Sequence, residues 1–240
     1  MRYIVLGRPF GLKDQAGELR ERLYRDFKAA WSVEFMEVDA RLGREFVWRS
    51  DAFLRQDYLA ALMDGDKAAC LHSYSLHDLT REYEWDKSYL RDVLTESALG
   101  VLRGLGVSSF MSMEHFIIMP EYRGGRELVN TFDAMVCLGL EFFHARAAAG
   151  AVVTLTRNAK SINKFLTRLE FRSILEDLTH NGEPADLMVY DSPVRAPHKR
   201  ADMERRIREL WENRLVLEAF PLDRAFPGQD NPLQDLARNA

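Results

Sequence analysis

The sequence predicts an α/β fold of the α+β kind, in which helices flank one mixed central sheet. Residues 109–156 read as a strand, a long amphipathic helix and a wholly apolar strand, which is the order of a βαβ unit. An Asn-Gly step at residues 181–182 lies between two further strand-like segments and is typical of a β-hairpin. A helical pattern over residues 202–214 then predicts a C-terminal helix. Elements in this order favour a sheet whose faces are covered by helices.

The first 108 residues have weaker patterns, so their elements rest on short stretches. Short β-branched or alternating stretches predict strands at residues 2–6, 33–38 and 68–76. Apolar positions three or four residues apart predict helices at residues 15–30, 53–62 and 90–104. Asp51 is a favoured N-cap residue for the second of these helices, and Gly65 would end it.

The second half of the chain has stronger signals. β-branched, aromatic and apolar runs predict strands at residues 109–119, 151–156, 171–177 and 186–190. Pro120 stops the first strand, and Gly150 ends a long helix over residues 127–149. No repeat, low-complexity tract or linker interrupts the chain. We therefore expect one domain over residues 1–220, followed by a polar tail over residues 221–240.

The composition indicates a globular protein and disfavours nucleic acid and anionic lipid as partners. The chain has 240 residues, of which 47% are hydrophobic and 29% charged, as in a globular protein with a sizeable core. A net charge of −4 provides no general basic field for nucleic acid or anionic lipid. The basic segment 195–208 is interleaved with Asp202 and Glu204, which disfavours a nucleic-acid partner.

The expected location is the cytoplasm. Cys70 and Cys137 lie far apart in apolar stretches without metal-ligand spacing, which predicts buried free thiols, as in a reducing compartment. No apolar run reaches the length that a membrane span requires.

Residues 119–128, MPEYRGGREL, join the strand at 109–119 to the long helix. Arg123 and Arg126 flank Gly124 and Gly125 at this junction. Free N–H groups and the helix dipole favour an anion there, and glycine lets the backbone approach a phosphate closely. The same residues also fit a plain strand-to-helix turn with exposed arginines, so the loop alone leaves both interpretations open.

Over residues 116–171, the sequence resembles the GNAT N-acyltransferases. Residues 118–120, Ile-Met-Pro, match the step that ends the family's central strand, and residues 121–124, Glu-Tyr-Arg-Gly, match the stretch that follows it. Residues 158–171 are similar to the family's next motif. The resemblance implies a GNAT-like fold, whose loop binds the pyrophosphate of coenzyme A through backbone N–H groups.

Two features depart from the family's pattern. The family's signature Arg-Gly-x-Gly-x-Gly/Ala is replaced by RGGREL, and Leu166 occupies the usual place of a general-acid tyrosine. An imperfect nucleotide loop and a large first half are similar to acyl-homoserine-lactone synthases and long-chain N-acyl amino acid synthases. The resemblance to these branches implies acyl carrier protein as a source of the acyl group. The implied donor is therefore acyl-CoA or the phosphopantetheine of acyl carrier protein, bound by residues 109–192. Residues 1–108 would hold a small-molecule amine acceptor such as an amino acid.

Direct acyl transfer to an amine requires a base. Strict alternation along residues 111–119 would place Glu114 on one face with Phe116 and Ile118, and His115 on the other. Glu114 lies near the position of a catalytic glutamate in several GNAT enzymes, so it is the predicted base, with His115 second. A buried ion pair with a structural arginine also explains Glu114, and a hydrogen-bonded core residue also explains His115.

The resemblance also implies residues that bind the acyl donor. The backbone of Ile118 and Met119 should pair with the pantetheine amides, because this strand separates from the next one in the family. Asn158, Ser161 and Phe165 are further candidates, although helix capping also explains Asn158 and Ser161.

Other residues are weaker candidates for a metal site or an acceptor pocket. His72 and His77 fall on opposite faces of a strand, so no metal site is predicted. Residues 83–86, Tyr-Glu-Trp-Asp, fit either an acceptor pocket or a solvated loop with one docked tryptophan. The alternative to an enzyme is a catalytically inactive protein of the same fold that binds a ligand or acts as a scaffold.

Overall fold

The computed structural model describes residues 1–7, 15–47, 56–81, 90–91, 93–146, 149–158, 162–180 and 182–217. The strands are β1 (Arg2–Gly7), β2 (Tyr58–Asp64), β3 (Lys67–Asp78), β4 (Ser109–Ile118), β5 (Ala151–Arg157), β6 (Arg172–His180), β7 (Glu183–Tyr190) and β8 (Leu215–Leu217). The helices are α1 (Gln15–Arg41), α4 (Glu96–Gly104), α5 (Gly125–Arg146), α6 (Ile162–Thr167) and α7 (Ala201–Glu212), with a 3-10 turn η1 (Pro120–Tyr122).

These strands join one mixed sheet in the order β6-β7-β5-β4-β3-β2-β1-β8. β4 is parallel to β5 and β8 is parallel to β1, whereas the other neighbours are antiparallel. Helix α5 connects β4 to β5, so the predicted βαβ unit is confirmed. The predicted hairpin is β6–β7, where His180 pairs with Glu183 around Gly182. Gly182 has a φ of +82°, a conformation that glycine adopts without a steric penalty.

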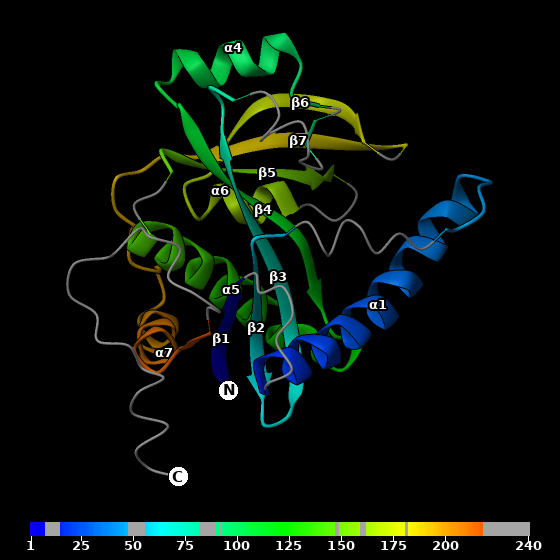
Figure 1. Cartoon of the computed structure of the whole chain (residues 1–240), viewed down its shortest axis with the longest axis vertical. Helices are drawn as coiled ribbons and strands as arrows, with labels where there is room; N and C mark the ends of the chain where they lie inside the picture. Colours follow the sequence, from blue (N-terminus) through cyan, green and yellow to red (C-terminus); the bar gives the residue numbers. More distant parts are fainter. Residues whose placement is uncertain are drawn as a thin grey trace.

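Helices cover both faces of the sheet. In Figure 1, α5 and α7 lie to the left of the strands and α1 lies to the right. On the α5 face, Phe142 stacks on Tyr74 with ring centroids 5.5 Å apart. On the α1 face, Leu23 and Phe27 are buried in one cluster with Ile117. The two clusters bury apolar side chains on opposite sides of β4, which is thus a central strand of the sheet.

Helix α5 approaches the sheet closely at Gly139. A Cβ atom at this position would lie 2.6 Å from Met113 Cε and 2.9 Å from the Tyr74 hydroxyl oxygen. The absence of a side chain therefore lets α5 pack directly over β3 and β4.

The prediction of a strand at residues 33–38 is wrong, because this segment belongs to α1. Phe27, Trp31 and Phe35 recur every four residues, and their rings stack at centroid distances of 5.2 and 4.5 Å. Contacts at this spacing stabilise a helix. Local alternation over six residues was too short to compete with this longer pattern.

The prediction of a helix through residues 53–62 is also wrong for its described part, because Tyr58–Asp64 is β2. Leu59, Ala60, Ala61 and Leu62 are all buried between β1 and β3. A strand buried on both faces lacks alternation and cannot be told from a buried helix by its apolar pattern. Residues 51–55 lie outside the described part.

Two smaller differences concern element ends. Helix α4 begins at Glu96 rather than near residue 90, because the Thr95 hydroxyl caps it by accepting a hydrogen bond from the Ala98 N–H. The three-residue β8 was not predicted, and it pairs with β1.

Cys70 and Cys137 are buried free thiols, as predicted. Among the described helices, none combines the length and apolarity that crossing a membrane requires. The predicted tail and residues 83–86 lie outside the described part of the chain.

Candidate active site

The parallel strands β4 and β5 separate partway along their length. In the described structure their ladder consists of the pairs Phe110–Ala151, Met111–Val152 and Ser112–Val153. One further hydrogen bond joins the two strands: the Thr154 hydroxyl donates to the Met113 carbonyl at 2.9 Å. Both strands continue beyond this point, so the sheet opens between their carboxyl ends. Carboxyl ends of parallel strands are where open α/β sheets commonly bind ligands.

A cavity of about 230 Å³ lies at this separation. The residues that line it are Trp31, Glu34, Phe116, Ile117, Ile118, Arg123, Phe132, Arg157, Ile162 and Phe165. Phe116 and Phe165 pack with the α5-face cluster, whereas Ile117 and Trp31 pack with the α1-face cluster. The cavity therefore extends from one face of the sheet to the other between β4 and β5.

The two ends of the cavity differ in chemistry. Phe116, Phe132 and Phe165 form its aromatic end, with successive ring centroids 5.0 and 5.3 Å apart. The ionic end consists of Glu34, Arg123 and Arg157. The predicted donor residues Ile118, Arg123 and Phe165 all line the cavity.

A β-bulge interrupts β4 at Glu114 and His115. Ser73 of β3 is opposite Glu114 and Leu71 is opposite Ile117, so β4 carries one extra residue here. His115 has a φ of +49°, an uncommon conformation for a residue other than glycine. The bulge corrects the sequence prediction: Glu114 and His115 do not lie on opposite faces, because their Oε2 and Nδ1 atoms are 3.9 Å apart.

The bulge also reverses the alternation of the neighbouring residues. Met113 and Phe116 both pack in the α5-face cluster although they are three residues apart. Glu114 instead shares its side of the sheet with Ser112, whose hydroxyl donates to its Oε1 atom. The expected grouping of Glu114 with Phe116 and Ile118 is therefore wrong.

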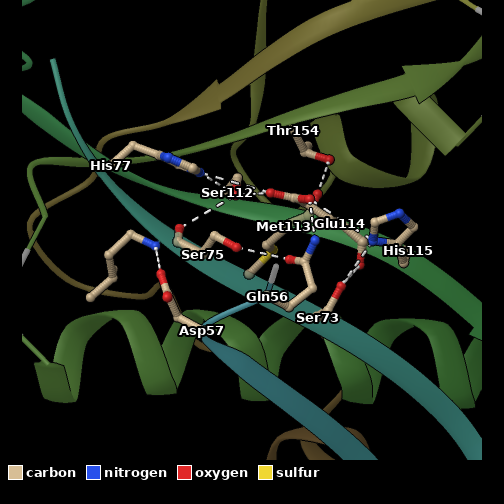
Figure 2. A network of polar contacts seen from close by, with 11 residues as sticks. Gln56, Asp57, Ser73, Ser75, His77, Ser112, Met113, Glu114, His115 and Thr154 are labelled. Atoms are coloured by element: carbon tan, nitrogen blue, oxygen red, sulfur yellow. Dashed lines mark hydrogen bonds and ion pairs between the residues drawn. The ribbon is translucent and has the colours of Figure 1, made fainter. Parts of the chain in front are cut away.

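The Glu114 carboxylate is the centre of a buried polar network (Figure 2). Gln56 Nε2 donates to its Oε2 at 2.7 Å, and His77 Nε2 lies 3.9 Å from its Oε1. Its side chain is 1% exposed. Burial raises the pKa of Glu114, but His77, the charge of His115, and hydrogen bonds from Ser112 and Gln56 lower the pKa by more. The carboxylate is consequently ionised and accepts hydrogen bonds.

A second layer of hydrogen bonds orients these partners. The Ser75 hydroxyl donates to Gln56 Oε1 at 2.8 Å, which directs the amide nitrogen of Gln56 toward Glu114. His77 Nε2 lies 3.1 Å from the Ser112 hydroxyl. Sequence reasoning missed Gln56, Ser75 and Ser112. Serines inside otherwise apolar strands were the available signal, because buried hydroxyls need partners.

His115 lies between this network and the cavity. Its ring packs edge-on against Phe27 and Trp31, at centroid distances of 5.9 and 5.2 Å, and Trp31 lines the cavity. Its Nδ1 is 3.2 Å from the Ser73 hydroxyl oxygen. Ser73 donates its single proton to the Glu114 carbonyl, so it accepts from His115 Nδ1–H. In the neutral imidazole, Nε2 then carries the lone pair.

The loop between β4 and α5 is held by protein contacts. Arg123 Nε donates to the Ile118 carbonyl at 2.7 Å, and the Met119 N–H donates to the Ala69 carbonyl at 3.0 Å. Gly124 does not have a positive φ, and a Cβ there would meet no atom within 4 Å. Neither the turn nor the packing thus requires glycine at residue 124. The Tyr122 hydroxyl donates to Asp64, at the β2–β3 turn, and its side chain packs against both apolar clusters.

Not every predicted donor residue can be placed. Gly125 and Arg126 begin α5, but their side-chain surroundings lie outside the described part, as does Ser161 entirely.

Asn158 is positioned by Asp186 at the end of β5. Asn158 Nδ2 donates to Asp186 Oδ1 at 3.0 Å, and Asn163 Nδ2 donates to Asp186 Oδ2 at 2.7 Å. Burial raises the pKa of Asp186, but these two amides and the Asp177 N–H lower it by more. The buried Asn158 Oδ1 has no hydrogen-bond partner among the described residues. A buried unpaired acceptor is costly, so a ligand N–H would stabilise it.

The two histidines of β3 lie on opposite faces, as predicted. His72 packs on Tyr74 and Phe116, whereas His77 packs on Phe110 and approaches Glu114. Burial, together with the nearby His115, lowers the pKa of His72 to about 3, so its imidazole is neutral. No group of three metal-ligating side chains comes together in the described part of the chain.

No protein-family model and no curated protein matches the sequence. Solved structures do match the fold. FeeM, an N-acyl amino acid synthase from uncultured soil microbes, is similar at 13% identity and a TM-score of 0.50, over 80% of this chain and 93% of FeeM. BjaI, a CoA-dependent acyl-homoserine lactone synthase solved with SAM and isopentyl-CoA, is similar at 10% identity and a TM-score of 0.52, over 92% of this chain and 94% of BjaI. The predicted GNAT-like fold is thereby confirmed.

Proposed function

We propose that this protein is an N-acyltransferase that moves an acyl group from a coenzyme A or acyl carrier protein thioester to a small-molecule amine. The observation that carries the proposal is the cavity between the separated strands β4 and β5, beside the Glu114–His115 bulge. This cavity passes through the sheet, and the buried Glu114 and His115 beside it can act as an acid–base pair. The fold shared with FeeM and BjaI supports the same reaction class.

The donor's pantetheine chain would enter between β4 and β5. Its phosphate would lie near the start of α5, where the open space beside Gly124 admits a ligand and helix N–H groups favour an anion. Gly125 and Arg126 are proposed to contribute to that anion site. Asn158 Oδ1 would accept from a pantetheine amide, and Ser161 is retained as a candidate from the sequence alone.

Binding the donor at Ile118 would require that the hydrogen bond to the Ile118 carbonyl change its partner. The Ile118 carbonyl accepts from Arg123 Nε, and a pantetheine amide would take that place. Arg123 would then be available to the phosphate, which the sequence prediction assigned to it. Met119 would hold the strand end through its bond to Ala69, and Phe165 would pack against the thioester end of the donor.

His115 is the proposed base, and Glu114 is proposed to act through it. Glu114 is too buried to contact an acceptor, whereas the His115 side chain is 11% exposed and lies beside Trp31 of the cavity wall. His115 Nε2 would take a proton from the attacking amine nitrogen as the new C–N bond forms. The ionised Glu114, 3.9 Å away, would stabilise the imidazolium. The C–S bond then breaks, and His115 returns the proton to the leaving thiolate.

An acyl-enzyme on cysteine is disfavoured. Burial raises the pKa of the Cys137 thiol to about 12 and that of Cys70 well above its usual range. Neither thiol lines the cavity. Leu166, in the usual place of a general-acid tyrosine, is buried and apolar and cannot donate a proton, so His115 is also the proposed general acid for the thiolate.

The test is a donor and acceptor screen with the full chain. Purified protein is incubated with acyl-CoA or acyl carrier protein thioesters and a mixture of amines, and products are identified by mass spectrometry. We expect an N-acyl product with one free thiol released per product. Tight donor binding without a product from any amine would contradict the proposal and favour the inactive ligand-binding protein. The two donor series separate coenzyme A from acyl carrier protein.

A further inference from the structure

Asp186 of β7 is a buried carboxylate whose partners are three N–H groups. The side chain belongs to a residue that is 6% exposed. Asn158 Nδ2 donates to its Oδ1 at 3.0 Å, the Asp177 N–H donates to Oδ1 at 3.1 Å, and Asn163 Nδ2 donates to Oδ2 at 2.7 Å. Burial raises the pKa of Asp186, but these hydrogen bonds lower it by more, so the carboxylate is ionised. An ionised carboxylate can only accept hydrogen bonds.

This carboxylate fixes the direction in which the Asn158 amide points. A side-chain amide has a donating NH₂ end and an accepting oxygen end. Because Asp186 can only accept, Asn158 turns its NH₂ group toward Asp186 and its Oδ1 away from it. Asn163 is oriented in the same way, and its Oδ1 accepts from the Lys164 N–H at 2.9 Å. The Asn158 Oδ1 is buried without a partner among the described residues, so this amide presents an unused acceptor.

Asn158 lies at the edge of the cavity. It directly follows Arg157, and the next described residue is Ile162, the first of α6; both of these neighbours line the cavity. Asp186 is two residues from Met188, so the two side chains share one face of β7. Met188 belongs to the α5-face cluster, against which Ile162 also packs. The Asn158 amide, which is bonded to Asp186, therefore lies on the α5 face beside the cavity wall.

We propose that Asp186 is a positioning residue for the acyl donor: by holding the Asn158 amide in one orientation, it makes the site select a donor arm that carries an N–H group. This inference rests on the proposed function, which supplies pantetheine as the donor arm. Pantetheine has two amides with one N–H each. One N–H is proposed to donate to the Ile118 carbonyl, and the other would donate to Asn158 Oδ1. A donor oxygen in place of this second N–H would face another acceptor, and both would lack a hydrogen bond.

The experiment measures the binding of pantetheine and of two analogues, in which oxygen replaces one or the other amide N–H. Dissociation constants are determined by ligand-observed NMR on the full chain, without an acceptor. Each analogue should bind the wild type about 10- to 100-fold more weakly than pantetheine, because each leaves one buried acceptor of the site unpaired. Only one of the two losses should depend on Asp186.

Asp186→Asn should remove or reverse that one loss. The new amide can donate to Asn158 Oδ1, so the Asn158 amide turns and presents its NH₂ group to the donor. This NH₂ group pairs with the oxygen of the analogue and no longer with the N–H of pantetheine. The ratio of the two dissociation constants reports this change and does not depend on the folded fraction of the variant. The other analogue, whose loss arises at the Ile118 carbonyl, should keep its ratio.

The exchanged pair Asn158→Asp with Asp186→Asn should restore the preference for the N–H group. In this double variant, the amide at residue 186 donates to the carboxylate at residue 158, which again presents only acceptor oxygens to the donor. Asp191→Asn is the matched control. Asp191 follows the same strand and pairs with Arg172 at the surface, so its replacement should leave both ratios at the wild-type values.

Three results would overturn the role of Asp186. They are no binding of pantetheine, equal binding of pantetheine and both analogues, and an Asp186→Asn variant that binds all three ligands more weakly by the same factor. The last result would mean that Asp186 only stabilises the fold. The proposed function fails separately: the expected ratios without an acyl product from any amine would keep the role of Asp186 and remove acyl transfer. Acyl transfer with unchanged ratios in Asp186→Asn would remove the role of Asp186 alone.

Discussion

β4 and β5 behave differently in the two halves of their length. Where they are paired, Met111, Val152 and Val153 are fully buried, and α5 packs over the neighbouring Met113 through Gly139. Where they separate, the same two strands line a cavity with arginine, aromatic and aliphatic side chains. The comparison shows that one pair of strands provides core in its first half and a ligand site in its second. Changes in the two halves should consequently affect different measurements.

The largest expected effect is on catalysis in the separated half. His115→Ala should lower kcat/KM by about 10²- to 10⁴-fold, because it removes the proposed general base. Steady-state kinetics measures this loss, and a thermal unfolding curve close to that of the wild type serves as the control. Equal activity of the variant would show that the bulge is structural and that His115 is not the base.

A smaller effect is expected when the buried carboxylate of Glu114, next to His115, is replaced. Glu114→Gln should lower the free energy of unfolding by about 2 to 3 kcal/mol at neutral pH, because it removes a carboxylate that accepts several hydrogen bonds. The folded-state pKa of Glu114 lies below its ordinary value of 4.5. Its contribution is thus complete above about pH 4.5 and is lost as the pH falls through the folded-state pKa.

Chemical denaturation at a series of pH values measures this dependence. The difference between wild type and Glu114→Gln should shrink as the medium becomes more acidic. A difference that grows on acidification would mean that Glu114 is protonated in the folded protein, contrary to its hydrogen-bond partners.

The smallest expected effect is in the paired half. Gly139→Ala should lower the free energy of unfolding by about 1 kcal/mol, at the mild end for overpacking. Met113 Cε, which a Cβ would meet first, ends a flexible side chain and can shift, whereas the buried Tyr74 ring cannot; the higher helix propensity of alanine offsets part of the resulting cost. Urea denaturation measures the change, while kcat/KM per folded molecule should stay the same. A loss of activity at full stability would show that the two halves are coupled.

The second half of the fold was predictable because its patterns are long and consistent with one another. The apolar strand β5 and the Asn-Gly hairpin could be placed from local residues alone. The pattern over residues 53–62 gave the wrong prediction of a helix. Strand β2 is buried on both faces, so its apolar residues do not alternate with polar ones as in a half-exposed strand. The strand predicted at residues 33–38 is wrong because this segment continues a helix that is stabilised by ring stacking beginning at Phe27.

The sequence by itself determined which residues carry unusual chemistry within the central strand. Glu114 and His115 stand out because a charge inside an apolar strand needs a partner. Tertiary structure decided how they are used. The bulge turns two consecutive side chains to the same side, and β3 brings the serines that orient them.

The ionic end of the cavity belonged entirely to the tertiary structure. Glu34, Arg123 and Arg157 are separated by many residues, and no local pattern links them. They meet because α1 crosses the separated strands, so that long-range packing places their charges together. Local propensity and periodicity can predict elements, but only the packed fold determines which distant charges share one cavity.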